Sequence, residues 1–109
     1  MYSNKTLGEY RNKLSVTGKH PSWLNAHIRV FNRAWNKEYT FLPCAKCNYS
    51  LHVELCHIKD VALYEDSELL GTVNDKENII QLCRNCHWEM GEGMIFAGMR
   101  TRSEILASL

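Results

Sequence analysis

The strongest chemical signal in the sequence is a pair of Cys-x-x-Cys motifs. Cys44 and Cys47 form the first motif, and Cys83 and Cys86 form the second. Four thiolates presented in pairs on tight turns are the ligand set of a closed tetrahedral zinc site. Buried cysteines without a metal would not explain two copies of one turn-sized spacing. The sequence therefore predicts one structural Zn²⁺, with a strand, a loop and a second strand inserted between the two motifs.

Two histidines lie close to these cysteines in the sequence. His57 directly follows a fifth cysteine, Cys56, and His87 directly follows the second Cys-x-x-Cys motif. Histidine suits proton transfer because its unperturbed pKa is near the working pH, and its neutral ring is a common metal ligand. Taken alone, His57 is explained better as a core residue, since strict alternation places it on the same strand face as Val53 and Leu55. His87 could likewise be a histidine on a helix surface.

The elements that must position these side chains begin with a helical front. A short helix or arm is expected in the polar residues 1–20. Pro21-Ser22 is a typical helix start. Apolar residues then recur at helical spacing and form one stripe, namely Leu24, Ile28, Phe31 and Trp35. Its other side carries polar residues that either bond phosphate oxygens or face water, namely Asn25, Arg29, Asn32, Arg33 and Asn36. Trp23 and Trp35 are expected in the core rather than stacked on bases.

A hairpin should follow this helix. The alternation of residues 51–56 predicts a half-buried strand. Residues 59–77 are acidic and are expected to form a long loop, and residues 79–82 restart an apolar run. A short helix is then expected after His87, ending at Gly91.

The chain should end in one more helix. Thr101 with Glu104 resembles a capping box for a helix over residues 105–109. The fold class expected is α+β, in one domain over residues 1–109. This domain has three expected parts: a basic helical part over 1–40, a zinc-stapled hairpin and helix over 41–95, and a C-terminal helical part over 96–109.

Length and charge narrow the class of protein further. A chain of 109 residues buries a small share of its surface, so a staple is expected, and no apolar run is long enough to cross a bilayer. Residues 1–46 hold eight Lys and Arg against two Glu, whereas residues 47–109 hold five against ten acidic residues. Clustered basic side chains release counterions from phosphates, so this asymmetry is compatible with a polyanionic partner, and a solvated charged surface is the alternative.

The order of these motifs resembles the HNH endonucleases, also called ββα-metal or His-Me finger nucleases. The segments CAKCNYSLHVELCHIKD and NDKENIIQLCRNCHWEMGEG are similar to a subgroup with the patterns C-x-x-C-G-Y, V-E-x-C-H-I and N-I-I-x-L-C-P-N-C-H-W-E. The resemblance covers roughly residues 40–95, and HPSWLNAHIRVFNRAW also looks like the stretch that precedes this core. It implies an enzyme that hydrolyses phosphodiester bonds of double-stranded DNA, with a role like that of restriction or homing endonucleases.

The resemblance also implies a role for each matching residue. His57 would be the general base, and Asn78 would pin the backbone of the loop that carries it, although an ordinary turn asparagine is the alternative. His87 would bind one catalytic Mg²⁺ or Mn²⁺ ion. Basic residues expected to contact DNA are Arg29, Arg33, Lys37, Lys59 and Arg84. A homodimer would be the simplest way to cut both strands, and the expected location is the cytoplasm of a bacterium or of a phage-infected cell.

Two positions depart from the family pattern. Cys56 stands where many members place a metal-binding Asp or His, so either it is a small buried hydrophobe with Glu54 as an oxygen donor nearby, or it contacts the metal itself. Gly91 stands where the subgroup commonly has Asp, which removes a carboxylate. The alternative function is therefore a non-catalytic zinc module that binds nucleic acid. A redox switch using Cys56 as an exposed thiol is a third and weaker interpretation.

Overall fold

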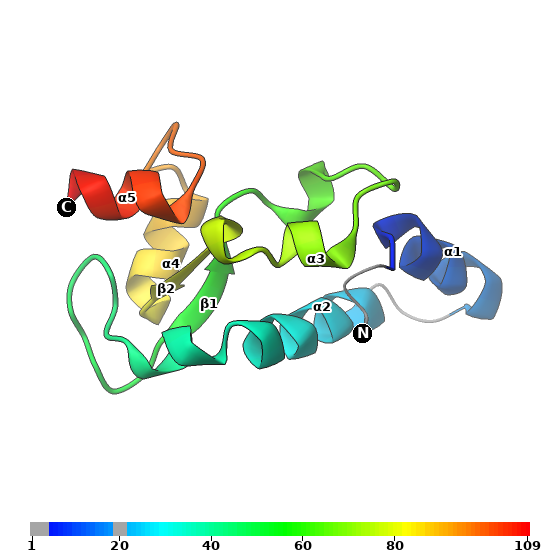
Figure 1. Ribbon diagram of the computed structural model, residues 1–109, viewed down its shortest axis with the longest axis horizontal. Helices are drawn as coiled ribbons and strands as arrows, with labels where there is room; N and C mark the ends of the chain where they lie inside the picture. Colours follow the sequence, from blue (N-terminus) through cyan, green and yellow to red (C-terminus); the bar gives the residue numbers. More distant parts are fainter. Residues whose placement is uncertain (1–4, 19–21) are drawn as a thin grey trace.

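A two-stranded sheet lies between helices in the computed structural model, which describes residues 5–18 and 22–109 (Figure 1). The α-helices are α1 (Leu7–Thr17), α2 (Ser22–Trp35), α3 (Leu70–Val73), α4 (Arg84–Gly91) and α5 (Arg102–Ser108). The strands are β1 (Glu54–His57) and β2 (Ile79–Leu82), and three 3-10 turns are η1 (Lys37–Phe41), η2 (Val61–Leu63) and η3 (Lys76–Asn78). No helix in these two ranges is long and apolar enough to cross a membrane. The α+β fold class is confirmed in this coarse form.

The sheet is an antiparallel pair that brings distant segments together. Glu54 pairs with Leu82 at one end, and His57 pairs with Ile79 at the other. The predicted strand over 51–56 is therefore wrong at both ends. Strand β1 forms only where β2 can pair with it, and β2 is confined between η3 and the start of α4. This register carries the pairing through His57, so the strand ends on the candidate base.

The helix predicted from the apolar stripe is confirmed as α2. Pro21, part of its predicted start, lies outside the described residues. Leu24 and Ile28 are buried in a cluster shared with α1 and α3. The polar side was predicted wrongly at two positions, because Asn32 and Asn36 are each only 1% exposed. The Asn36 amide donates to Asn32 Oδ1 and to the Asn74 carbonyl, so tertiary partners replace water.

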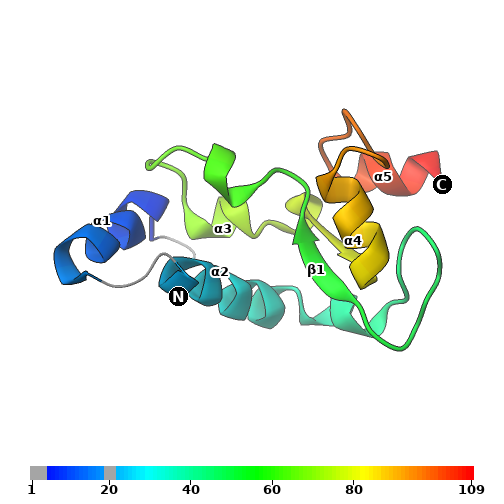
Figure 2. The same cartoon turned by 180° about the vertical axis from the view of Figure 1, so that it is seen from behind.

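The segment 59–77 was predicted as a loop but folds into short helical turns. Asp60 and Asp75 cap η2 and η3 by accepting hydrogen bonds from backbone N–H groups two residues on. Leu70 and Val73 of α3 are completely buried. Burial of these two side chains over α2 explains why the acidic segment is structured, and Figures 1 and 2 both show α3 lying along α2.

The helix α1 packs against this same segment. The Gly8 N–H donates to the Asp66 carbonyl at 2.9 Å, and an added Cβ at Gly8 would lie 2.9 Å from the Asp66 Cβ. A side chain at position 8 would therefore force the backbones apart. Arg11 adds an ion pair with the Asp66 carboxylate at 2.6 Å. The expected short helix in residues 1–20 is thus present over Leu7–Thr17, while residues 1–4 and 19–20 lie outside the described residues.

The last two helices begin earlier than predicted. Cys83 is the N-cap of α4, so α4 begins at Arg84 and includes His87, which had been placed before the helix. Thr101 caps α5 as expected by accepting a hydrogen bond from Glu104 N–H at 3.1 Å, and α5 therefore starts at Arg102. Placing Cys86 and His87 on consecutive positions of one helix fixes their directions relative to each other.

Candidate functional site

Four cysteines converge at the open end of the hairpin. The sulfur atoms of Cys44, Cys47, Cys83 and Cys86 all lie within 4.8 Å of one another. Cys47 Sγ and Cys83 Sγ are 3.6 Å apart, which is far longer than a disulfide bond of about 2.05 Å. Tetrahedral ligands on Zn–S bonds of about 2.3 Å lie about 3.8 Å apart. The four-cysteine cluster is therefore consistent with a zinc site.

The backbone around Cys44 is shaped for this cluster. Cys44 O accepts the Asn48 N–H at 2.9 Å, and Asn48 has a left-handed backbone with φ 67°. Burial opposes ionisation of the Cys44 thiol, yet backbone hydrogen bonds from Cys47, Cys83 and Lys46 lower its pKa to about 6. Since metals bind the thiolate, the turn favours the form of Cys44 that a metal needs.

His57 lies at the end of β1 and is half-buried. Its Nε2 is 2.7 Å from Asn74 Oδ1. Burial lowers the pKa of His57 and so favours the neutral ring, while the Asn74 hydrogen bond and the Asp60 carboxylate oppose this effect. A neutral imidazole is the form that can accept a proton.

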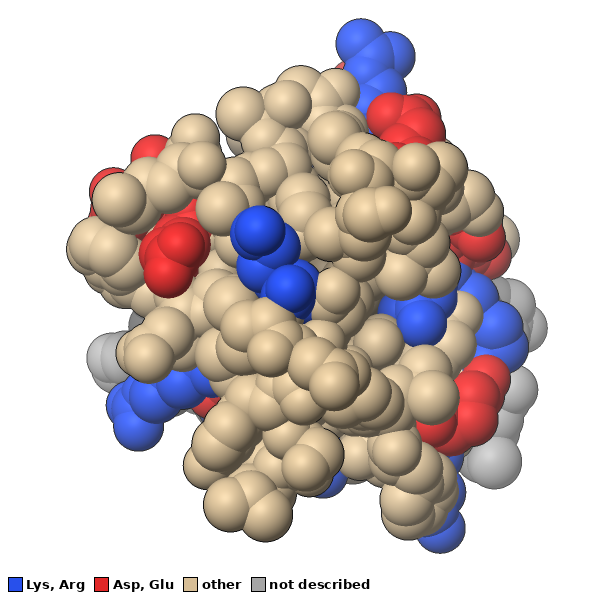
Figure 3. Space-filling view, turned by 90° about the vertical axis from the view of Figure 1, so that its left-hand side faces the viewer, with Lys and Arg blue, Asp and Glu red and all other residues tan. Residues whose placement is uncertain are grey.

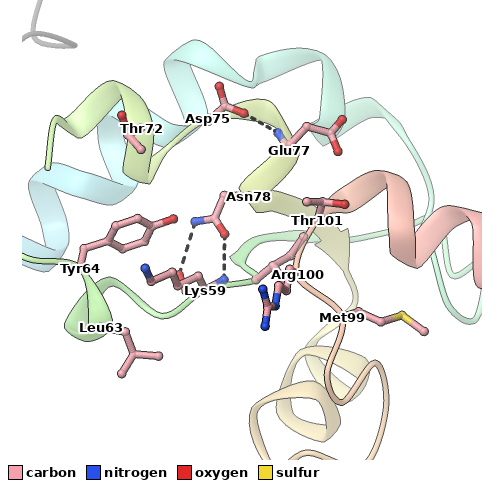
Figure 4. A pocket seen from close by; sticks show the side chains of 11 residues that line it. Lys59, Leu63, Tyr64, Thr72, Asp75, Glu77, Asn78, Met99, Arg100 and Thr101 are labelled. Atoms are coloured by element: carbon pink, nitrogen blue, oxygen red, sulfur yellow. Dashed lines mark hydrogen bonds between the residues drawn. The ribbon is translucent and has the colours of Figure 1, made fainter.

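Asn78 joins the two ends of the segment between β1 and β2. Its Oδ1 accepts the Lys59 N–H at 2.8 Å, and its Nδ2 donates to the Val73 carbonyl at 2.9 Å and to the Lys59 carbonyl at 3.4 Å. Figure 4 shows the bonds between Asn78 and Lys59, beside a cavity of about 590 Å³. Asn78 thus holds the backbone of the segment that follows His57, and any effect of this on catalysis stays a prediction.

His87 lies on α4 and is oriented by a residue of β1. Its Nδ1 is 2.8 Å from Glu54 Oε1, and its side chain is about half-exposed. Because Glu54 occupies Nδ1, Nε2 is the ring nitrogen left for a ligand. A carboxylate bonded to the far nitrogen is the usual way to orient a metal-binding histidine. Glu54 is thus placed to orient His87.

One cavity brings the two histidines together. It has a volume of about 350 Å³ and is called here the His57–His87 cavity, lined by His57, Ile58, Asp60, Leu63, His87, Met90 and Gly91. The positive form of His87 also acts to lower the pKa of His57, as expected for neighbouring rings. The two imidazoles therefore share a cleft, although they come from β1 and α4.

The two departures from the family pattern have different surroundings. Cys56 is 1% exposed, belongs to the core around Ile80 and Leu82, and donates to the Glu54 carbonyl at 3.4 Å. Burial raises the pKa of its thiol well above the ordinary range. These facts fit a small buried hydrophobe and contradict an exposed redox thiol. Gly91 lines the His57–His87 cavity, and an added Cβ there meets no atom within 4 Å.

Two polar residues of the site were not predicted from the sequence. Asp60 lines the His57–His87 cavity, and no role had been assigned to it although it closes the segment CHIKD. Asn74 contacts His57 directly. Neither residue belongs to a recognisable spacing pattern, because α3 and the capping turns bring them to His57.

The five predicted DNA contacts are all exposed, but they do not lie together. Arg29 and Arg33 line a cavity of about 260 Å³ that Glu54 and His87 also line, whereas Arg84 lies beside Cys47 and Lys59 lies near Asn78. The fifth, Lys37, begins η1. Figure 3 views the end of the molecule that carries α5 and shows basic and acidic side chains scattered among uncharged ones. Among the predicted contacts, Arg29 and Arg33 therefore approach His87 from α2.

No family model, curated protein or solved structure matches the chain. The function therefore rests on the chemistry of the chain's own residues.

Zinc content tests the four-cysteine cluster. We expect elemental analysis to find about one zinc per chain, and Cys83→Ser to lose most of it, because a closed site needs all four thiolates. Chelation should also unfold the hairpin end, as seen by circular dichroism. Cys56→Ala is the matched control and should keep full zinc content, since Cys56 lies outside the cluster. A well-folded preparation without metal would contradict the site.

The pKa of His57 gives a second test. An NMR titration of the zinc-loaded protein should place this pKa below 6.5, because burial disfavours the charged ring. The unfolded chain then binds the proton more readily than the folded chain. The His57 contribution to the free energy of unfolding is therefore full above pH 6.5 and is lost as pH falls below that value. His57→Gln should remove this component of the pH dependence, and a pKa at or above 6.5 would contradict the prediction.

Proposed function

We propose that the chain is a metal-dependent endonuclease of the HNH type that hydrolyses phosphodiester bonds of double-stranded DNA. One observation carries the proposal: His57 and His87 line a single cavity although they come from a strand and a helix. One imidazole is bonded to an asparagine and the other to a carboxylate, so the two rings have different partners. This difference suits one ring to proton transfer and the other to metal binding.

The proposed mechanism uses the neutral ring of His57 as general base. It takes a proton from a water molecule as the water oxygen attacks phosphorus. Asn78 holds the segment after His57, so that the ring keeps its position during the reaction. A positioned general base typically contributes about 10² to 10⁴-fold to a rate.

His87 Nε2 and Asp60 Oδ2 would hold a divalent ion, because both residues line the His57–His87 cavity and Asp60 Oδ1 is already bonded to the Ala62 N–H. Mg²⁺ or Mn²⁺ supplies Lewis-acid stabilisation of the phosphate and of the leaving oxygen when bound. The donor set fits, because Mg²⁺ commonly uses only one or two protein ligands and keeps several waters. Glu54 bonds His87 Nδ1 and so supports the ligand rather than adding another. Cys56, being buried in the core, takes no part.

DNA is proposed to reach the cavity across α2. Arg29 and Arg33 are exposed and line a cavity that His87 also lines, so a phosphate bound there would lie next to His87. These contacts are to the backbone and carry no sequence information by themselves. Two copies of the chain would allow both strands to be cut.

Cleavage of supercoiled plasmid tests this proposal. The zinc-loaded protein should nick or cut plasmid with Mg²⁺ or Mn²⁺ and not with EDTA, and His57→Ala should slow the reaction by about 10² to 10⁴-fold. His27→Gln is the control, because His27 is a histidine of α2 that lines neither the His57–His87 cavity nor the cavity of Arg29, Arg33 and His87. Both variants should keep the wild-type zinc content. A wild type that retards plasmid in a gel but leaves it intact with every divalent ion would instead support a non-catalytic nucleic-acid-binding module.

Gly91→Asp tests the role of the missing carboxylate. The substitution places a carboxylate in the His57–His87 cavity, where the structure has open space for a Cβ and no positive φ to strain it. We expect the concentration of Mn²⁺ that gives half-maximal cleavage to fall by about 10-fold, which corresponds to about 1.4 kcal/mol. Gly91→Asn is the uncharged control and should change it little. An equal response to both substitutions would contradict an electrostatic effect on the ion.

A further inference from the structure

Asn74 is a buried asparagine that joins three elements at His57. It is the C-cap of α3 and is 2% exposed. Its Oδ1 is 2.7 Å from His57 Nε2, and its Nδ2 donates to the carbonyl of Ile28 on α2 at 3.2 Å. Both ends of the amide are therefore engaged, one by the candidate base and one by a helix backbone.

These partners decide which way the amide faces. The Ile28 carbonyl can only accept a hydrogen bond, so the NH₂ group of Asn74 must point toward it. The oxygen then faces His57, and this oxygen can also only accept. His57 Nε2 must therefore carry the hydrogen in this contact. A neutral imidazole has a single N–H, so Nδ1 is the nitrogen with the free lone pair.

The backbone of Asn74 is held by two further buried asparagines, Asn32 on α2 and Asn36, which directly follows α2. Asn36 Nδ2 donates to the Asn74 carbonyl and to Asn32 Oδ1, both at 2.9 Å. Lys76 Nζ lies 3.5 Å from Asn36 Oδ1 and supplies a donor to it. Rotation of Asn74 would leave buried polar groups unpaired, which costs about 1 to 3 kcal/mol for each group. The orientation of Asn74 is therefore set by α2 and not by His57 alone.

We propose that Asn74 is a positioning residue that fixes the tautomer of His57, so that Nδ1 is the atom that receives the proton of the attacking water. The receipt of the proton rests on the proposed nuclease function, whereas the tautomer does not. In that step the water O–H bond breaks and its proton moves to Nδ1 while the oxygen bonds to phosphorus. The phosphorus bond to the leaving oxygen breaks, and the electron pair departs on that oxygen.

NMR of the imidazole nitrogens tests the tautomer without any nuclease assay. In zinc-loaded, ¹⁵N-histidine-labelled protein above the pKa of His57, two-bond ¹⁵N–¹H spectra should show a protonated Nε2 and an unprotonated Nδ1. Asn74→Asp removes the donor to the Ile28 carbonyl but keeps the acceptor that faces His57, and it should therefore keep this pattern above the pKa of His57. Asn74→Leu is similar in size but has no acceptor, and it should lose the single tautomer. Asn36→Ala is the control, because Asn36 bonds the backbone carbonyl of Asn74 and contacts neither its side-chain amide nor His57, so the wild-type pattern should remain.

Plasmid cleavage by the same proteins tests the consequence for catalysis. Asn74→Leu should cut about 10 to 100-fold more slowly than wild type, as is typical when the partner that orients a functional histidine is removed. Asn74→Asp and Asn36→Ala should lose far less. An Asn74→Leu variant that cuts at the wild-type rate would overturn the positioning role.

If Asn74→Leu does not fold, the wild-type spectra alone still show which nitrogen of His57 carries the proton. A wild-type His57 with its proton on Nδ1 would overturn the inference whatever the variants do. If wild-type His57 carries the proton on Nε2 but no divalent ion supports cleavage, the nuclease proposal fails while the tautomer assignment stands.

Discussion

Convergence of four cysteine sulfurs is the constraint on which the rest of the candidate site depends. The sheet has only two strands of four residues each, too small to hold its ends by pairing alone. The cluster joins the turn before β1 to the first turn of α4, which follows β2 immediately. The direction of α4 relative to β1 is thereby fixed. His87 follows Cys86 by one residue, so the same constraint aims its ring toward β1.

Buried side-chain amides provide the second level of order. Asn74 contacts His57, and Asn78 holds the backbone just beyond it, so the ring and its segment are fixed by different asparagines. Among the described residues, no buried side-chain nitrogen or oxygen lacks a hydrogen-bond partner. Fully satisfied polar networks of this kind rigidify their surroundings, because any movement would expose an unpaired group to a low-dielectric interior. Such rigidity would suit the role of general base proposed for His57.

Elements that depend only on residues close together in the sequence were predicted correctly. The two Cys-x-x-Cys motifs predicted the cluster, the apolar stripe predicted α2, and Thr101 predicted the cap of α5. Errors appeared where a boundary depends on a distant partner. The start and end of β1 follow from β2, and the turns over 59–77 follow from burial of α3 on α2.

By itself the sequence determined which residues are candidates for the chemistry, because cysteine and histidine are recognised by type and spacing. Only the tertiary structure decided which of them meet. His57 and His87 line one cavity, and Cys56 is buried in the core. Asn32 and Asn36 were expected to face solvent, but they are buried and bonded to each other. The physical reason is that a polar side chain on a helix is favourable in water or in a satisfied buried network, and its partners decide between the two. Those partners lie on segments far away in the sequence, so a local sequence pattern cannot predict them.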